Sequence, residues 1–547
     1  MKSISKAPII LVTGQQGSGK TATIAAIANK LLSRVDIKIK IYEHYAGITR
    51  ASLNSISMLR RLLCQMIQDH PNCASQFPIE QIRSSNYTDL CKIFSDFLRT
   101  RASKSNLVIC IDGIELLDND TLVQTLNFIP KDFNFEKITF ILSATEDNQV
   151  EKACKSVANT IVIDISNLEL LERSEIVRKH LDRFGKKLDE QAFSSQMKFI
   201  TSKRDSFKPS YLTLLCEELL LMTDYEKKIT EKLKSIPQRQ NLFLLEIFKR
   251  LDNLFTETYV ATAFGLILSA RQDLTEQELR DLMNISYGTM KTLPPPDNFT
   301  YPITTTPLQL ADFIYNCHIL LKPQLYDGPQ TVSIASNEIR QIVKARYIRS
   351  NEQQTSLYKL LAFYYWSEAN GPHWTSMNSK AFEHLPFYLY AADEYKLFSS
   401  ILTDLKFLSG KCRVGLVQSL IDDYELTKPT SSATQTINLS KTKGMLAVNT
   451  KERQMNEASL QQYRSFVQRN NHILAVNPSL IYQQSLNELE TSSVFDDIQQ
   501  IITNQDKDDQ INAFVRINKP DHMEQMKYSI EDFTEPTRCL AISPSGK

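Results

Sequence analysis

The stretch Ile10–Leu32, ILVTGQQGSGKTATIAAIANKLL, decides how the first third of this 547-residue chain folds. It starts as an apolar run and then meets glycines, a lysine and a threonine. Its second half carries apolar residues at a helical spacing. The pattern therefore predicts a buried strand, a tight glycine-rich turn and a helix, in that order.

The turn reads Gly14-Gln15-Gln16-Gly17-Ser18-Gly19-Lys20-Thr21 and matches G-x-x-x-x-G-K-[ST] at every fixed position. Chance gives such a match in roughly 2% of chains of this length. Glycines let backbone N–H groups turn inward around phosphate oxygens, and the positive end of the following helix favours the same anion. We expect the backbone of Gly14–Gly19 to bind phosphates, Lys20 to reach the β- and γ-phosphates, and the Thr21 hydroxyl to bind Mg²⁺. The turn therefore predicts a site for ATP or ADP with Mg²⁺.

A second apolar run, NLVICIDGIELLDND from Asn106 to Asp120, supplies two acidic candidates. Asp112 follows the buried run Leu107–Ile111 directly, and ligands of open parallel sheets bind at that end of the strands. We expect Asp112 to hold Mg²⁺, the alternative being an ordinary turn residue at a strand end. Glu115 is a candidate to orient or deprotonate the attacking water, the alternative being a surface acid.

Ser143 ends a third run, ITFILSATED, and is a candidate to sense the γ-phosphate. A capping role for its hydroxyl is an equally good interpretation.

Five short runs rich in β-branched and aromatic residues alternate with helical patterns through the first third of the chain. They are Pro8–Val12, Ile37–Tyr42, Leu107–Ile111, Thr139–Leu142 and Thr160–Ile165, with helices expected at Thr21–Leu32, Ser57–Gln68 and Tyr87–Arg99. Alternation of this kind is typical of crossover units on a parallel sheet that is buried on both faces. Residues 1–165 are therefore predicted to form an α/β domain.

After Ser166 the strands largely stop, and helical periodicity predicts a small helical domain over residues 166–256. Thr275 and Glu278 have capping-box spacing, and Asp327-Gly328 stands between two alternating runs as in a hairpin. A helix-rich segment that ends in a hairpin favours a winged helix over residues 257–350. Helices resume over 351–426, the polar stretch 427–450 is predicted as a linker, and 451–525 as a further helical segment.

The composition excludes several classes of protein. A net charge of +1 gives no overall basic field toward nucleic acid or anionic lipid. The cysteines are odd in number, never in Cys-x-x-Cys spacing, and indicate a reducing compartment without a zinc or disulfide framework. No apolar run is long enough to span a membrane. We therefore expect a cytoplasmic or nuclear protein without a membrane partner.

The order of the segments resembles the NACHT-type signal-transduction NTPases, in the branch that includes telomerase-associated protein, nephrocystin-like proteins and NACHT/WD-repeat proteins. The resemblance rests on the phosphate loop followed by YEHYAGITRASLNSISMLRRLLCQMI, ICIDGIELLD, FILSATED, ERSEIVRKHLDRFGKKL, KPSYLTLLCEELL and the hairpin. It implies a P-loop α/β domain, a helical lid, a winged helix and an all-α arm before a β-propeller. The closing stretch FTEPTRCLAISPSGK is similar to the first strand and turn of a WD repeat. Residues 526–547 are accordingly expected to be a truncated first repeat, and the sequence a fragment of a longer protein.

The resemblance also implies particular roles for residues of the site. Pro209 in KPSYL matches the family's lid proline near the base, whereas Ser336 stands where many relatives place a histidine on the β-phosphate. Leu116 fills the position where many members have the catalytic glutamate, and no arginine follows Ser143 as it does in many relatives. Slow or absent hydrolysis is therefore expected.

Two hypotheses of function follow. The first is an ATP/ADP switch whose nucleotide state gates conformational change and homo-oligomeric assembly, with protein partners on the helical arm and the missing propeller. The alternative is a non-hydrolysing scaffold, stabilised by nucleotide, of a multiprotein complex or of a ribonucleoprotein. Nucleic acid is a disfavoured partner, through such a ribonucleoprotein or through the small basic cluster VKARYIR that ends the wing segment. A phosphotransferase is disfavoured because the lid, wing and arm offer no acceptor pocket.

Overall fold

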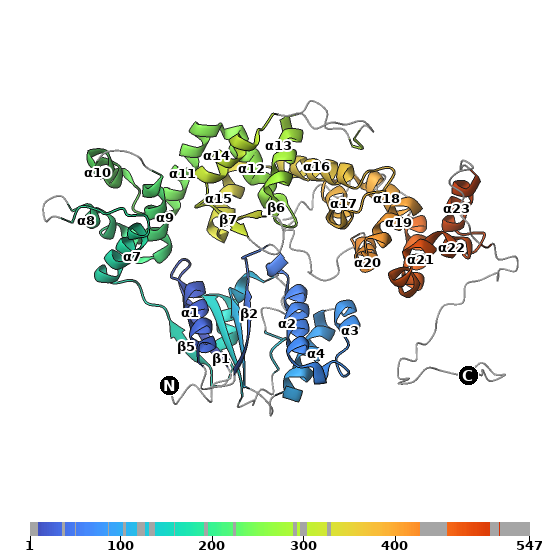
Figure 1. The fold of residues 1–547 in the computed structure, drawn as a ribbon, viewed down its shortest axis with the longest axis horizontal. Helices are drawn as coiled ribbons and strands as arrows, with labels where there is room; N and C mark the ends of the chain where they lie inside the picture. Colours follow the sequence, from blue (N-terminus) through green and yellow to red (C-terminus); the bar gives the residue numbers. More distant parts are fainter. Residues whose placement is uncertain are drawn as a thin grey trace. The chain divides into compact units, whose positions relative to one another are not determined.

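Five parallel strands form the sheet that carries the glycine-rich turn (Figure 1). The strands are β1 (Ile9–Gly14), β2 (Ile39–Tyr45), β3 (Asn106–Asp112), β4 (Ile138–Thr145) and β5 (Ile161–Asp164), in the spatial order β2-β3-β4-β1-β5. The predicted α/β fold with a parallel sheet is confirmed. Because β4 lies between β1 and β3, the residues at its end stand between the glycine-rich turn and Asp112.

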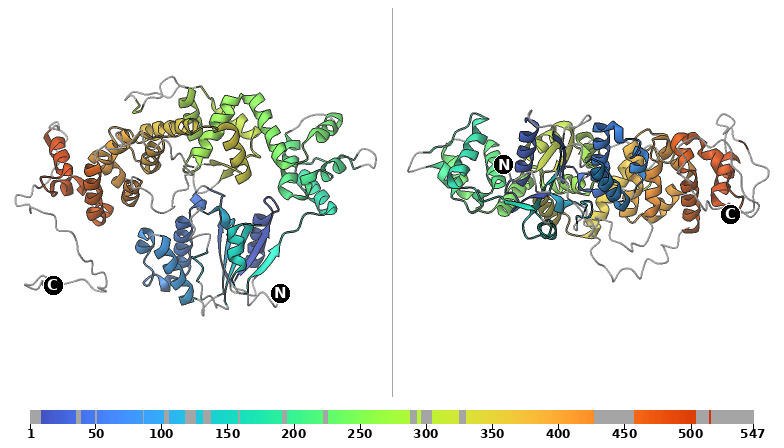
Figure 2. Two further views of the ribbon diagram at one scale, coloured as in Figure 1. Left: turned by 180° about the vertical axis from the view of Figure 1, so that it is seen from behind. Right: turned by 90° about the horizontal axis from the view of Figure 1, so that it is seen from below.

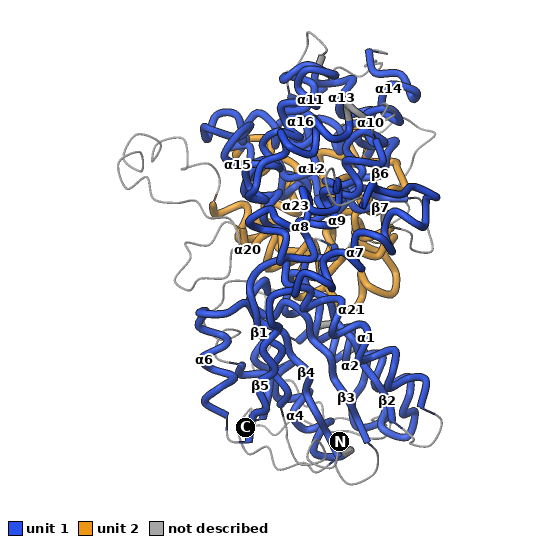
Figure 3. The backbone as a smooth tube through the Cα atoms, turned by 90° about the vertical axis from the view of Figure 1, so that its left-hand side faces the viewer, with its two compact units in different colours: residues 1–368, 384–394, 427–450 blue, residues 369–383, 395–426, 451–547 orange. Residues whose placement is uncertain are grey.

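This computed structural model describes most of the chain. The described residues are 9–34, 39–49, 51–85, 87–101, 106–117, 126–130, 137–157, 159–190, 195–221, 226–287, 293–295, 304–324, 330–426, 457–503 and 514. They divide into two compact units, of which the first comprises residues 1–368, 384–394 and 427–450 (Figure 3). The predicted linker 427–450 and WD-repeat segment 526–547 lie outside the described residues, and the domain boundaries stay predictions.

Alternate residues of β1 serve two hydrophobic cores, one on each face of the sheet. Ile10 and Val12 pack with Ile24 and Ala28 of α1 (Lys20–Leu32). Ile9 and Leu11 belong to the other core, which α2 (Ser55–Asp69), α4 (Tyr87–Arg101) and α6 (Gln149–Lys155) help to form. Figure 2 shows α2 and α4 together on one flank of the sheet, with α3 (Ile79–Ser84) beside them. The period of two thus buries the inner strands on both faces, as predicted.

The edge strand β5 departs from that expectation. Val162 and Ile163 remain 41% and 43% exposed. An edge strand has one neighbouring strand instead of two, so the burial typical of a parallel sheet holds for the inner strands here.

The rest of the first unit is largely helical, as predicted. Its elements after β5 are α7 (Leu170–Asp182), α8 (Gln196–Thr201), α9 (Pro209–Leu220), α10 (Glu226–Ser235), α11 (Gln240–Phe255), α12 (Glu257–Ser269), α13 (Glu276–Tyr287), α14 (Pro307–Asn316), α15 (Asn337–Tyr347) and α16 (Asn351–Glu368). A small antiparallel sheet joins β6 (Leu274–Thr275), β8 (Thr331–Ile334) and β7 (Leu321–Gln324), in that order. The predicted turn Asp327-Gly328 lies outside the described residues.

The predicted capping box at the start of α13 forms. The Thr275 backbone N–H donates to the Glu278 carboxylate at 2.8 Å, and the Glu278 N–H donates to the Thr275 hydroxyl at 3.1 Å. Two N–H groups that no helical carbonyl reaches are thereby satisfied. The winged-helix assignment of residues 257–350 stays a prediction.

The second unit is also helical. It comprises residues 369–383, 395–426 and 451–547, with α18 (Tyr395–Leu402), α19 (Leu405–Arg413), α20 (Val417–Glu425), α21 (Glu457–Val476), α22 (Ile481–Leu486) and α23 (Ser493–Thr503), while α17 (Ser379–Ala391) contributes residues to both units. Its core includes Trp374, whose indole N–H donates to Asp404 at 2.7 Å. Lys411 and Asp423 form a buried ion pair. In the described part of the chain, no helix is both long and apolar enough to cross a membrane.

One buried histidine near the end of β2 gives the fold a dependence on pH. His44 is 5% exposed, its Nε2 faces the Ser52 carbonyl at 2.8 Å, and its Nδ1 faces an Arg61 guanidinium nitrogen at 3.2 Å. Burial lowers the pKa of His44 to about 4, and the Arg61 charge contributes to that shift. The neutral ring, donating from Nε2 and accepting at Nδ1, is therefore the form that the folded chain holds.

We expect acid to destabilise the protein through His44. Below a pH of about 6.5 the unfolded chain binds a proton at this residue, while the folded chain does so only below about 4, so stability falls as the pH drops through that window. This residue should lower the stability at pH 5 by about 2 kcal/mol relative to pH 7. Thermal melting at both pH values measures the effect, which should shrink in His44→Gln and persist in His472→Gln, a change at an exposed histidine. An equal loss in all three proteins would contradict the assignment.

Candidate functional site

The glycine-rich turn, Gly14–Thr21, joins β1 to α1 and is called the phosphate loop below. Gly17 and Gly19 have φ angles of 81° and 101°, in the left-handed region that favours glycine, and Gly19 is the N-cap of α1. The Ser18 N–H donates to the Gln15 carbonyl at 3.2 Å, which closes the turn. The predicted order of strand, turn and helix is confirmed.

Lys20 begins α1 and folds back over the loop. Its ammonium donates to the carbonyls of Gly14 and Gln15, both at 2.9 Å. Burial lowers the pKa of Lys20, and the charges of Glu115, Asp112 and Glu146 oppose that shift. The cation therefore lies among carboxylates at the carboxyl edge of the sheet, where it can neutralise an added polyphosphate only in part.

Asp112 closes the other side of the loop. The Thr21 hydroxyl donates to its Oδ2 at 2.7 Å and the Ser143 hydroxyl to its Oδ1 at 2.6 Å. Ser143 in turn accepts from the Gly113 N–H at 2.8 Å. The two residues predicted as Mg²⁺ ligands, Thr21 and Asp112, are thus direct neighbours. The fully buried Ser143 of β4 fixes the orientation of the Asp112 carboxylate.

Ser143 lies two residues before the end of β4, whereas the sequence placed it at the strand end. The residue that ends β4 is Thr145, whose N–H and hydroxyl donate to Glu115 Oε1 at 3.1 and 2.5 Å. The other carboxylate oxygen of Glu115 is buried and, among the residues that the structure describes, has no hydrogen-bond partner. One oxygen of Glu115 is therefore anchored and the other is available to a water or a ligand.

Leu116 turns the opposite way from Glu115. Both belong to the short 3₁₀ helix η4 (Ile114–Leu116), but the Leu116 side chain packs against the hydrophobic core and lies over Gly113 and Gly47. The position at which the resemblance implies a catalytic glutamate thus carries a packing residue here. Glu115 is the acid of this segment whose charge reaches Lys20.

Helix α9 approaches the phosphate loop from the helical part of the unit. Pro209, its first residue, lies over Gly19, with Cγ 3.7 Å from the point where a Cβ would stand. The Ser210 N–H donates to the Gly17 carbonyl at 3.3 Å. Ser336, the other residue that the resemblance singled out, is the N-cap of α15 and accepts from the Ile339 N–H at 3.3 Å.

The residues present fit a nucleotide with Mg²⁺. Thr21 and Asp112 offer hard oxygen ligands from a hydroxyl and a carboxylate, the donor chemistry that Mg²⁺ prefers. The Ser18 hydroxyl within the loop is buried and, as far as the described chain shows, has no partner. Gly17 and Gly19 carry no side chains of their own that could cover the backbone N–H groups of the loop.

Three residues of the site, Thr145, Glu146 and Ser210, were not predicted from the sequence. Thr145 and Glu146 stand in the same polar stretch as Ser143, so their position after a strand was a usable signal. For Ser210 the sequence held no such signal, because its contact with Gly17 joins segments almost 200 residues apart. No cluster of three or more histidines, cysteines or acids suited to a metal occurs within the described ranges.

Comparisons with known proteins agree with this geometry. A sequence profile of the AAA ATPase domain matches residues 2–132, and such a domain binds nucleotide. Telomerase protein component 1 of Mus musculus is 24% identical over 562 residues, covering 98% of this chain and 20% of that protein. NACHT domain- and WD repeat-containing protein 1 of Mus musculus is 20% identical, covering 78% of this chain and 29% of that protein. NACHT and WD repeat domain-containing protein 2 of Homo sapiens is 20% identical, covering 65% of this chain and 20% of that protein.

The chain spans less than a third of the length of each of these relatives. Within that span, the site and the relatives agree. The phosphate loop and the Asp112 carboxylate across β4 are features of P-loop NTPases, as is the matched ATPase domain. The profile match and these relatives together support a NACHT-like branch of the P-loop NTPases as the group that this chain resembles.

Proposed function

We propose that the protein is an ATP/ADP switch whose nucleotide state gates a conformational change and assembly. The observation that carries this proposal is the contact of α9 with the phosphate loop at Gly17 and Gly19. A nucleotide shifts a conformational equilibrium only through its different affinity for two arrangements. A helix that touches the loop itself is placed to differ between an ADP-bound and an ATP-bound loop.

Each polar group of the site then has a role. The loop amides and Lys20 would bind the phosphates, and Thr21 and Asp112 would hold Mg²⁺, which would supply charge neutralisation. Ser143 keeps the Asp112 carboxylate oriented through its hydroxyl. Glu115, fixed at one oxygen by Thr145, orients the attacking water with the other.

Turnover after Glu115→Gln tests the proposal. We expect slow phosphate release from ATP in the unaltered protein, ADP as the copurified nucleotide, and release lowered about 100-fold in the variant, because the amide cannot take a proton from water. Affinity for ATP should change little, since Glu115 does not contact the loop amides. Glu175→Gln, at an exposed carboxylate of α7, is the matched control and should keep full turnover.

A second candidate function is a scaffold that nucleotide stabilises without turnover. The packing of Leu116 against the core favours it, because the resemblance implies a catalytic glutamate at that position. The name of telomerase protein component 1 suggests, for this chain, membership of a multiprotein or ribonucleoprotein complex in the cytoplasm or the nucleus. Bound ATP that stays intact for hours in the unaltered protein would contradict the switch and support the scaffold.

Protein partners are proposed on the helices after α15 and on WD repeats of the kind that the relatives' names include. Homo-oligomers are the form of assembly that the switch would gate. Light scattering of the protein with ADP and with a non-hydrolysable ATP analogue measures this directly. A larger particle with the ATP analogue is the expected result.

A further inference from the structure

A chain of hydrogen bonds leads from the phosphate loop to helix α15. Its first link is the Ser210 N–H on the Gly17 carbonyl, at 3.3 Å. Pro209 occupies the first position of α9 and has no N–H, so Ser210 is the first residue of this helix with an N–H to offer. The loop carbonyl thus satisfies one of the donors that the helix itself leaves unpaired.

The second link fixes the side chain of Ser210. Its hydroxyl donates to the Gln240 side-chain carbonyl at 2.8 Å. Gln240 is the first residue of α11, and its own backbone N–H donates to Asp205 at 2.9 Å. Gln240 is therefore held at its backbone as well as at its amide group.

The third link reaches α15. The Gln240 amide nitrogen donates to Glu338 Oε2 at 2.7 Å, and Glu338 lies in the first turn of α15. A carboxylate can only accept, so Glu338 sets the direction of the whole chain: the amide nitrogen faces Glu338, the amide oxygen faces Ser210, and the Ser210 hydroxyl must donate. Burial raises the pKa of Glu338, while the Lys208 charge and the Gln240 hydrogen bond oppose that shift.

The Glu338 end of this link borders open space. A cavity of about 410 Å³ lies beside it, lined by Gln16, Lys208, Asn241, Glu338, Gln341, Ile342 and Ala345. The Gln240–Glu338 bond thus runs along open space instead of through a packed core. The first turn of α15 is held by directional hydrogen bonds as well as by the packing of the buried Ile339.

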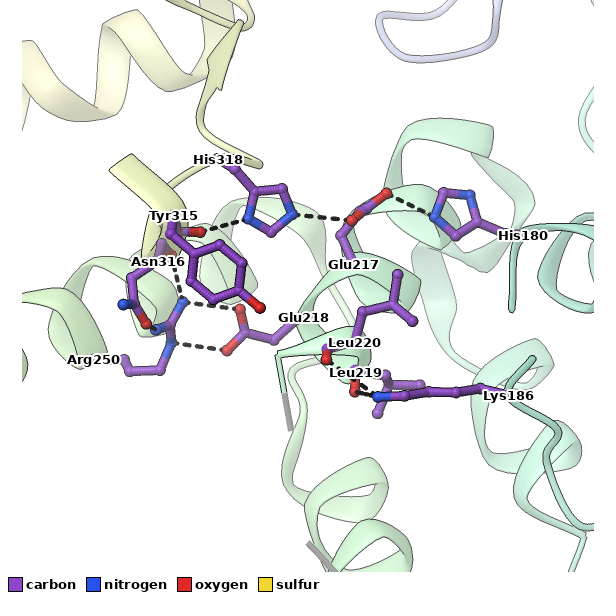
Figure 4. Close-up of polar contacts among 10 residues, drawn as sticks. All are labelled: His180, Lys186, Glu217, Glu218, Leu219, Leu220, Arg250, Tyr315, Asn316 and His318. Atoms are coloured by element: carbon purple, nitrogen blue, oxygen red, sulfur yellow. Dashed lines mark hydrogen bonds and ion pairs between the residues drawn. The ribbon is translucent and has the colours of Figure 1, made fainter. Parts of the chain in front are cut away.

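The far half of α9 is fixed to other helices (Figure 4). Glu217 accepts from His180 of α7 at 2.8 Å and from His318, just after α14, at 3.0 Å. Glu218 pairs with Arg250 of α11 at 2.9 and 3.1 Å. With its far half held in this way, α9 moves together with α7, α11 and the end of α14, so a displacement at its N-terminus cannot be absorbed by α9 alone.

We propose that Gln240 is a positioning residue, which holds the N-terminus of α9 on Gly17 through Ser210 and joins it to α15 through Glu338, so that occupancy of the phosphate loop is transmitted to α15. The inference rests on the proposed function, since it names the path by which the nucleotide site acts. Gln240 acts on the loop through Ser210.

Exchanging the two end groups tests the path. Gln240→Glu places a carboxylate against Glu338 and breaks that link, although it still accepts from Ser210. Glu338→Gln alone keeps an amide acceptor for Gln240. The double variant Gln240→Glu/Glu338→Gln restores the bond with donor and acceptor reversed. Gln341→Glu adds the same charge one turn along α15 and is the matched control.

Hydrogen exchange of the full chain is measured first without nucleotide. Gln240→Glu is expected to speed exchange of the Ser210 amide and of the amides in the first turn of α15 by about tenfold, and the double variant to restore both. Unaltered exchange in Gln240→Glu, or no recovery in the double variant, would overturn the inference. This comparison stands even if the protein fails to bind nucleotide, a failure that would contradict the proposed function alone.

The same proteins are then measured with ADP and Mg²⁺. Nucleotide is expected to slow exchange across α15 in the unaltered protein, in Glu338→Gln, in Gln341→Glu and in the double variant. Gln240→Glu should bind ADP and yet lose the protection of α15. Equal protection of α15 in Gln240→Glu and the unaltered protein would show that the signal takes another path and would contradict the inference.

Discussion

Lys20→Ala is expected to weaken the binding of ADP and ATP about 100-fold, because it removes the cation that the loop holds over the phosphates. Both carbonyls that fix the ammonium belong to the loop, so no other lysine can take its place without rebuilding the turn. The charges of Asp112, Glu115 and Glu146 surround that position and would then face the phosphates uncompensated.

Thermal melting makes the effect of Lys20→Ala visible without an activity assay. A ligand at 1,000 times its Kd stabilises a protein by about 4 kcal/mol, which falls to about 1.4 kcal/mol when the Kd rises 100-fold. The nucleotide-dependent shift of the melting temperature should therefore shrink to about a third in the variant. Lys30→Ala, at an exposed lysine in the last turn of α1, should keep the whole shift. Melting curves that do not respond to nucleotide in any of these proteins would contradict the site.

Gly17→Ala is expected to abolish nucleotide binding at millimolar concentrations, through two separate effects. A left-handed φ of 81° costs a residue with a side chain about 1–2 kcal/mol. The added Cβ would also stand 2.2 Å from the Ser210 hydroxyl oxygen and 3.1 Å from its Cβ. The Ser210 hydroxyl must then rotate out of its bond with Gln240. The loop or the N-terminus of α9 must also shift slightly to relieve the remaining contact with the Ser210 Cβ, which weakens the Ser210–Gly17 hydrogen bond.

Two further proteins separate the effects in Gly17→Ala. Gly185 has a φ of 67° and no atom within 4 Å of an added Cβ, so Gly185→Ala reports the backbone cost alone and should bind nucleotide normally. Gly17→Ala/Ser210→Gly removes the clash but keeps the strained backbone, and should recover part of the affinity. Calorimetric titration with ADP measures all of these. Normal binding by Gly17→Ala would show that α9 does not rest on the loop.

The ends of the strands were the weak part of the sequence analysis. The apolar runs ended at Val12 and Tyr42, whereas β1 continues to Gly14 and β2 to Tyr45. The added residues are polar but have partners: the Thr13 hydroxyl donates to Glu151 at 3.1 Å, and His44 is held between Ser52 and Arg61. A prediction from hydropathy ends a strand at the first polar residue. In the folded chain, a polar residue that has a hydrogen-bond partner can continue the strand.

The sequence by itself determined the phosphate loop, the alternation of strands and helices, and the acidic residue opposite the loop. These features are local, because the spacing of glycines, the period of apolar residues and the end of an apolar run each constrain the backbone around them. Asp112 could be chosen from sequence because the carboxyl end of a buried strand is where ligands of such sheets lie.

The tertiary structure alone decided which side chains meet there. The order β2-β3-β4-β1-β5 puts Ser143 between the loop and Asp112. The folding of η4 anchors Glu115 on Thr145 and packs Leu116 against the core. The packing of α9 brings Ser210 to Gly17. The period of apolar residues predicts that a residue is buried, but it does not predict which residue packs against it. Neighbours depend on strand order and on contacts between segments far apart in the chain, which no local pattern encodes.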